Sequence, residues 1–132
     1  MKKYDLLQRA YMDLTLAQMI VSQPLSDELH LDMAAYHTQQ ALEKTMKYKI
    51  DSVGETFPFV HEIDVLYSRM EELGLNPPEW IWDNYTVFNN YATKTRYGEN
   101  LVAVKRGLLE LLAKVEAYCN DVRHQQEQRQ QQ

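Results

Sequence analysis

The spacing of apolar residues along the chain predicts helices rather than strands. From Tyr4 to Ser22, apolar side chains recur every three or four residues, which is the period of one helix face. The same period returns in four later segments, each bounded by residues that cap or end helices. Short connections between long helices favour antiparallel neighbours. We therefore predict an all-α protein, an up-and-down antiparallel bundle of about five helices.

Proline, glycine and capping residues set the bounds of these predicted helices. The first ends at 23–25, the second spans 26–53, the third carries its apolar face over 63–73, the fourth runs from 76 to about 98, and the fifth begins at 100. Pro24 interrupts the first helix, and Ser26 is a good N-cap for the second. Gly54 and Gly74 are expected to end the second and third helices, because glycine readily adopts the left-handed conformation found there.

The last eight residues differ in composition from the rest of the chain. Residues 125–132 are all Gln except Glu127 and Arg129. A segment without apolar side chains cannot offset the entropy of ordering by burial. The predicted domain organisation is therefore one helical bundle over residues 1–124, followed by a disordered Gln-rich tail over 125–132.

Composition and charge exclude several classes of protein. Cys119 is the only cysteine, so no intrachain disulfide can form, and this favours the cytoplasm over a secreted, disulfide-stapled fold. The most apolar late stretch, 101–118, carries five charged residues, too many for a helix that spans a bilayer, so we expect no membrane insertion. The net charge of −5 offers no general attraction to nucleic acid, and such a partner would need a local basic patch.

One polar stripe on the second predicted helix is a candidate binding site. Helical spacing places His37, Gln40, Lys44 and Lys47 on the same stripe. These side chains have the charge and the hydrogen-bonding groups to bind a phosphate or a nucleobase. The alternative is that they solvate the outer face, or satisfy each other across a contact between helices.

A second candidate lies at the end of the fourth predicted helix, where Arg96 and Tyr97 precede Gly98. Arginine suits bidentate contacts with phosphate, but an Arg followed by Gly is also an ordinary helix C-terminus. His61, at the start of the third helix, is a lone histidine. Because the chain has no metal-ligand spacing among its histidines, no phosphate-binding glycine loop and no catalytic serine motif, we predict neither a metal nor a cofactor.

Three of these features together resemble the HEPN domain family (higher eukaryotes and prokaryotes nucleotide-binding). They are the run Tyr36-His37-x-Gln39-Gln40-Ala41-x-Glu43-Lys44, the pair His61-Glu62, and Thr95-Arg96-Tyr97, in order and spacing over roughly 5–122. The resemblance implies a helical bundle that usually forms a homodimer, in a family tied to nucleotides or RNA. It also implies a minimal nucleotidyltransferase as partner, in a toxin–antitoxin-like pair.

The resemblance argues against the family's nuclease mechanism. Its ribonuclease branch carries an Arg followed four to six residues later by His, yet neither Arg96 nor any other Arg of this chain has a His at that spacing. Arg96 and Tyr97 match the non-nuclease pattern instead. The predicted function is therefore a nucleotide- or partner-binding module in which Lys44 and Arg96 meet phosphate while His37 and Gln40 supply hydrogen bonds.

Two other functions remain open at this point. One is a divergent ribonuclease toxin that uses Arg96 with His37 or His61, and the other is a structural subunit with no ligand. The binding-module prediction also has a geometric premise. If the helices strictly alternate in direction, the second and fourth run parallel, and Lys44 and Arg96 then lie toward the same end of the bundle.

Overall fold

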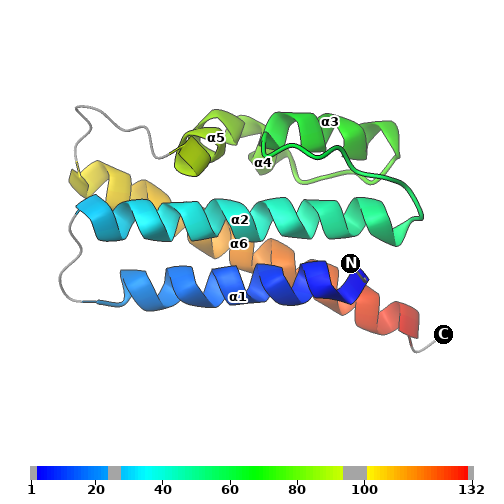
Figure 1. Cartoon of the computed structure of the whole chain (residues 1–132), viewed down its shortest axis with the longest axis horizontal. Helices are drawn as coiled ribbons and strands as arrows, with labels where there is room; N and C mark the ends of the chain where they lie inside the picture. Colours follow the sequence, from blue (N-terminus) through cyan, green and yellow to red (C-terminus); the bar gives the residue numbers. More distant parts are fainter. Residues whose placement is uncertain (1–2, 24–27, 94–100, 131–132) are drawn as a thin grey trace.

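The computed structural model describes residues 3–23, 28–93 and 101–130, and all regular secondary structure in them is helical. The helices are α1 (Lys3–Val21), α2 (Glu28–Ser52), α3 (Ile63–Glu72), α4 (Glu79–Asp83), α5 (Tyr85–Thr93) and α6 (Leu101–Gln130). Figure 1 shows the three long helices α1, α2 and α6 side by side, with α3, α4 and α5 along α2. The predicted all-α class is confirmed.

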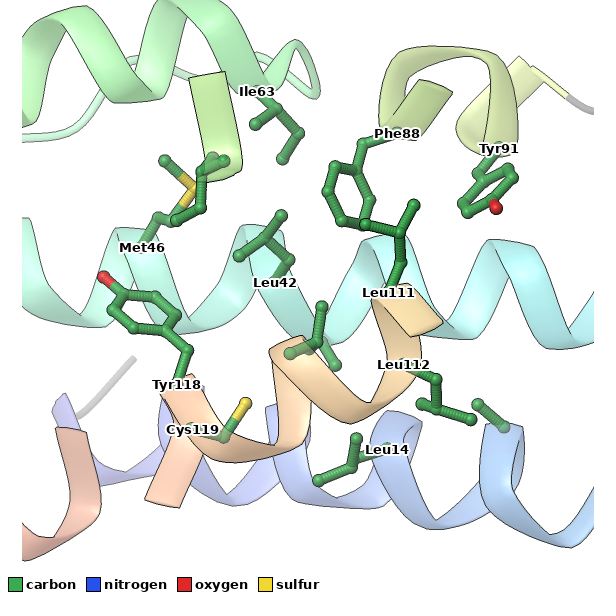
Figure 2. Packing of buried hydrophobic residues seen from close by; sticks show 14 of the residues in the cluster. Leu14, Leu42, Met46, Ile63, Phe88, Tyr91, Leu111, Leu112, Tyr118 and Cys119 are labelled. Carbon is green, nitrogen blue, oxygen red and sulfur yellow. The ribbon is translucent and has the colours of Figure 1, made fainter. Parts of the chain in front are cut away.

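Small side chains allow α1 and α2 to pack closely as an antiparallel pair. The alanines buried along these two helices are Ala10, Ala17, Ala34, Ala35 and Ala41. Helix α6 runs parallel to α2, as two contacts show: Thr45 Oγ1 lies 3.1 Å from Cys119 Sγ, and Lys49 Nζ donates to Gln125 Oε1 at 2.9 Å. The core fills the space between α2, α6 and the shorter helices, where Leu42, Phe88 and Leu111 converge (Figure 2).

Helix α3 runs in the same direction as α2, because segment 53–62 returns along the bundle before α3 begins (Figure 1). At one end of this return, Gln39 Nε2 donates to the backbone oxygen of His61 at 3.1 Å. At the other end, Arg69 of α3 pairs with Glu55 at 3.3 Å, just beyond the end of α2.

Because α3 runs in the same direction as α2, the helix that follows α3 runs opposite to the direction that was expected. Helix α5 is antiparallel to α2, so its last residue, Thr93, lies toward the end of the bundle where α2 begins (Figure 1). The prediction that the second and fourth helices run parallel is therefore wrong. The expected placement of Lys44 and Arg96 toward the same end of the bundle depended on that direction, and Arg96 itself lies outside the described residues.

The fourth predicted helix is divided into α4 and α5 at Asn84. The Asn84 side chain donates from Nδ2 to the backbone oxygen of Trp80 at 2.7 Å, which closes α4. The backbone oxygen of Asn84 accepts a hydrogen bond from the Phe88 N–H at 3.1 Å, which begins α5. Asparagine favours such positions because its short polar side chain competes with the helical hydrogen bonds of the backbone.

Both predicted glycine ends are confirmed. Gly54 and Gly74 have φ angles of 80° and 70°, and each follows a helix. After α3, the Gly74 N–H donates to the Glu71 oxygen and the Leu75 N–H to the Met70 oxygen, both at 3.0 Å. This pair of bonds satisfies two carbonyl groups that have no partner within the helix. The predicted cap Ser26 lies outside the described residues.

Helix α6 extends beyond the last apolar position of its periodic face. The segment predicted to be a disordered tail from Gln125 is helical as far as Gln130. Glutamine, glutamate and arginine are good helix formers, and extending an existing helix avoids the cost of nucleation. Pairs four residues apart add support: Arg123 Nε lies 3.9 Å from Glu127 Oε1, and Gln128 Nε2 lies 3.1 Å from His124 Nε2. No helix among the described residues is long and apolar enough to cross a membrane.

Candidate functional site

Part of the polar stripe on α2 faces α1, where it surrounds the buried carboxylate of Asp13. His37 Nδ1 lies 2.8 Å from Asp13 Oδ1, and Lys44 Nζ donates to Asp13 Oδ2. A buried carboxylate is tolerated only when a cation and further hydrogen-bond donors satisfy it. His37 and Lys44 therefore help to hold α1 against α2.

A second polar network joins α2 to segment 53–62 through the buried side chain of Gln39. Gln40 Nε2 donates to Gln39 Oε1 at 2.7 Å, and Gln39 Nε2 in turn donates to Glu43 Oε1 at 3.1 Å. The same Gln39 nitrogen also reaches the backbone oxygen of His61 at 3.1 Å. Gln40 thus supports the buried amide of Gln39, and this amide fixes the position of segment 53–62.

Glu43 is the centre of this network, with only 3% of its surface exposed. Its carboxylate lies 3.1 Å from Lys47 Nζ and 3.1 Å from His61 Nδ1. The His61 ring remains 75% exposed, so Glu43 orients a histidine that is accessible from solvent. Lys47 also stacks 5.5 Å from the centroid of the Phe57 ring, a cation–π contact.

A cavity of about 400 Å³ opens between the first turns of α1, the second half of α2 and segment 53–62. Its lining residues are Leu6, Arg9, Glu43, Lys44, Lys47, Asp51, Phe57 and Phe59. Phe59 is 96% exposed and packs edge-on against Phe57, with 5.9 Å between ring centroids. Cations and exposed aromatic surface together suit an anionic ligand that also carries a flat or apolar part.

The structure brings some of the predicted site residues together and separates others. Lys44 lines the cavity, and His61 adjoins it through Glu43. His37 and Gln40 belong to the two polar networks beside it. Arg96 and Tyr97 lie outside the described residues.

Sequence reasoning missed several residues of the cavity, among them Arg9, Phe57 and Phe59. The two phenylalanines flank Pro58 in a connecting segment, and exposed aromatics in a loop are a usable signal of binding. Arg9 has no such signal, because its relevance depends on how α1 packs against α2. Among the described residues, no group of three or more His, Cys, Asp or Glu side chains is arranged to hold a metal ion.

Comparison with protein families identifies the fold that carries this cavity. The model of the HEPN domain matches residues 4–125, nearly the whole chain. The chain belongs to the HEPN domain family. No curated protein and no solved structure matches it.

In this HEPN domain, the run from Tyr36 to Lys44 lies on α2 at the junction of α1 and segment 53–62. Its polar members satisfy Asp13 and Glu43, two buried carboxylates on neighbouring helices. The run therefore serves the packing of the HEPN fold, and one of its residues, Lys44, also lines the cavity. Membership of the family relates the chain to nucleotides or RNA.

Proposed function

We propose that this HEPN domain is a non-catalytic module that binds a nucleotide in the cavity between α1, α2 and segment 53–62. The observation that carries the proposal is the combination of Arg9, Lys44 and the exposed Phe59 ring around one cavity. Arg9 and Lys44 contact the phosphate, since charge-assisted hydrogen bonds to phosphate are strong. Phe59 stacks on the base.

The charges of the lining support an anionic ligand. Lys47 is already paired with Glu43. The partner of Lys44 is Asp13, which does not line the cavity, and Arg9 is exposed at its edge. Asp51 also lines the cavity, so the lining carries three cations and two carboxylates. A phosphate that enters still meets a net positive charge, although the chain as a whole is acidic, because the local potential decides binding.

The proposal also covers the partners of the module. We infer that it acts as a homodimer together with a minimal nucleotidyltransferase, as in a toxin–antitoxin-like pair. Membership of the HEPN family supports this inference. Arg96 and Tyr97 are assigned to the same function as ligand or partner contacts.

Nucleotide affinity measured by calorimetry tests the site. With adenosine 5′-monophosphate and ATP as probes, Arg9→Gln and Phe59→Ala should each weaken binding by about tenfold, since one charged hydrogen bond or one base stack contributes roughly 1–3 kcal/mol. Lys44→Ala should have a similar effect. Arg106→Gln, which removes an exposed charge from α6, is the matched control and should bind as the original chain does.

Thermal stability must be measured in parallel, because Lys44→Ala also leaves Asp13 without its cation. Arg9 and Phe59 are exposed, so their variants separate binding from folding. If the substitutions lower the melting temperature and leave the affinity unchanged, these residues are structural and the proposed site is wrong.

The exposed His61 ring, held by Glu43, is the one observation that favours a ribonuclease instead. A carboxylate that fixes an imidazole is a common arrangement for proton transfer. Because no Arg has a His at the nuclease spacing, we expect RNA to remain intact with the purified chain. Cleavage that disappears in both Arg96→Ala and His61→Ala would establish the enzyme and displace the binding module.

A further inference from the structure

A second cavity lies between the C-terminal parts of α2 and α6, and it shares no lining residue with the first. Its volume is about 360 Å³, and its lining residues are Tyr48, Lys49, Ser52, Val122, Gln125, Gln126, Gln128 and Arg129. Two of these residues are cations, and none is a carboxylate. The cavity exists because α6 continues as a helix through the Gln-rich segment and, at Gln125, contacts Lys49 in the last turns of α2.

The two cations reinforce each other at this cavity. Lys49 is partly buried, and its amino group donates to the neutral amide oxygen of Gln125 at 2.9 Å. Burial and the positive charge of Arg129 both lower the pKa of Lys49. Two like charges in a partly desolvated place raise the free energy of the site unless an anion is present.

Nearby carboxylates do not neutralise this pair. Glu127 of α6 lies 3.9 Å from Arg123, and Asp51 of α2 lines the other cavity, although its charge also reaches Tyr48. Among the described residues, neither Lys49 nor Arg129 forms an ion pair with a carboxylate. The positive potential of the cavity is therefore available to a ligand.

Neutral hydrogen-bonding groups surround the two cations. The phenol of Tyr48, whose pKa is raised by burial, is protonated at neutral pH and can donate a hydrogen bond. The amides of Gln125, Gln126 and Gln128 offer both donors and acceptors along one side of the cavity. Such a lining suits an anion attached to a small polar body, such as a sugar.

We propose that this cavity binds a phosphate group, held between Lys49 and Arg129, with the glutamine amides of α6 around the rest of a small phosphate ester. Lysine binds phosphate as a point charge, and arginine can add a bidentate contact. The cavity volume accommodates a phosphate with an attached sugar. This site lies apart from the proposed nucleotide site and does not depend on it.

Titration of the full chain, followed by the backbone amide NMR signals of Ser52 and Gln128, tests the site. The probes are inorganic phosphate, ribose 5-phosphate and adenosine 5′-monophosphate. We expect saturable shifts at both signals, and about tenfold weaker binding in Lys49→Gln and in Arg129→Gln. Arg106→Gln removes the same charge from the other end of α6 and should leave the affinity unchanged. Tighter binding of the esters than of phosphate itself would identify a phosphate ester as the ligand, whereas equal binding would identify free phosphate.

Two results would overturn the proposal. One is the absence of saturable shifts with all three probes, and the other is undiminished affinity in Arg129→Gln, which changes an exposed side chain and should fold normally. Lys44→Ala separates the two proposed sites. If this variant loses nucleotide binding while the Ser52 and Gln128 signals still respond to phosphate, the two sites are independent. If Lys44→Ala is the only variant in which both responses fail, the Lys49 cavity is not a phosphate site.

Discussion

Cys119 lies in the core, at the point where α6 meets α2 (Figure 2). Its sulfur is 3.1 Å from the Thr45 hydroxyl, and no part of the residue is exposed. Burial raises the pKa of this thiol from 9.0 to about 11. Because the thiolate is the reactive form, the folded protein protects Cys119 both by exclusion of reagents and by its protonation state.

We predict that Cys119 reacts with a thiol reagent at pH 8 only as fast as the protein unfolds. The raised pKa also predicts a pH dependence of stability: the contribution of Cys119 to the free energy of unfolding should be constant below about pH 9 and fall as the pH rises through 11, since the unfolded thiol ionises first. Thiol labelling and denaturant titrations check both statements, with Cys119→Ser as the control for each. Rapid labelling of the native protein would contradict the buried position.

Glu43 and Gln39 show what sequence reasoning could not reach at the scale of single residues. The helical period correctly placed His37, Gln40 and Lys44 along one side of α2. It could not say that α1 and segment 53–62 cover this side, because the covering elements are distant in sequence. The alternative in which polar side chains satisfy each other across a helix contact accounts for His37, which pairs with Asp13 of α1, whereas Gln40 donates to Gln39 on its own helix.

Helix ends were predictable where one residue decides them and not where packing does. A glycine with positive φ is a local signal, and both Gly54 and Gly74 were recognised. The break at Asn84 has no glycine or proline. At this break, two tryptophans of α4 pack against different helices. Trp80 packs against Tyr118 of α6, with 6.4 Å between ring centroids, and Trp82 packs against Tyr67 of α3, with 5.3 Å between ring centroids.

At the scale of elements, the last turns of α6 provide a test. Deletion of residues 125–132 should lower the melting temperature by no more than about 3 °C, because the segment buries no apolar side chain and the lost Lys49–Gln125 hydrogen bond contributes roughly 1 kcal/mol or less. Thermal denaturation followed by circular dichroism measures the shift. A loss of many degrees would mean that these turns contribute to the core. The same deletion removes Arg129 and should abolish phosphate binding at the Lys49 cavity.

At the scale of the whole molecule, segment 53–62 determines the topology. A tight connection after Gly54 would have made α3 antiparallel to α2, as the sequence suggested. Instead the chain returns as far as Gln39, where the backbone of His61 is bound. Only then does α3 start, with the Ile63 N–H donating to Asn89 Oδ1 of α5 at 2.9 Å. The order of the helices and the antiparallel pairing of α1 with α2 were therefore predictable, and the directions of the helices after α2 were not.

The packing of the aromatic residues bears on where a dimer interface can lie. The fourth predicted helix, 76–98, carries many aromatic side chains, and such residues are enriched at interfaces. In the structure Phe88 and Tyr91 are buried, and Trp80 packs between Phe88 and Tyr118, so the tryptophan of this group that stays exposed is Trp82, at 43%. The exposed apolar side chains of α1 form a different surface, with Met12, Leu16 and Met19 exposed by 66%, 42% and 59%.

We predict that two copies associate through this stripe of α1. Residues 12, 16 and 19 lie on one helix face, and a symmetric pair of such stripes removes apolar surface from water on both copies. Sedimentation at micromolar concentration should show a dimer, and Met12→Glu combined with Met19→Glu should yield a folded monomer, because the substituted side chains are exposed in the single chain. Trp82→Glu is the matched control on α4, where the exposed fraction is 43%. If Trp82→Glu alone dissociates the dimer, the interface lies on α4 and α5. If the unsubstituted chain sediments as a monomer, neither surface holds two copies together and both interfaces are excluded.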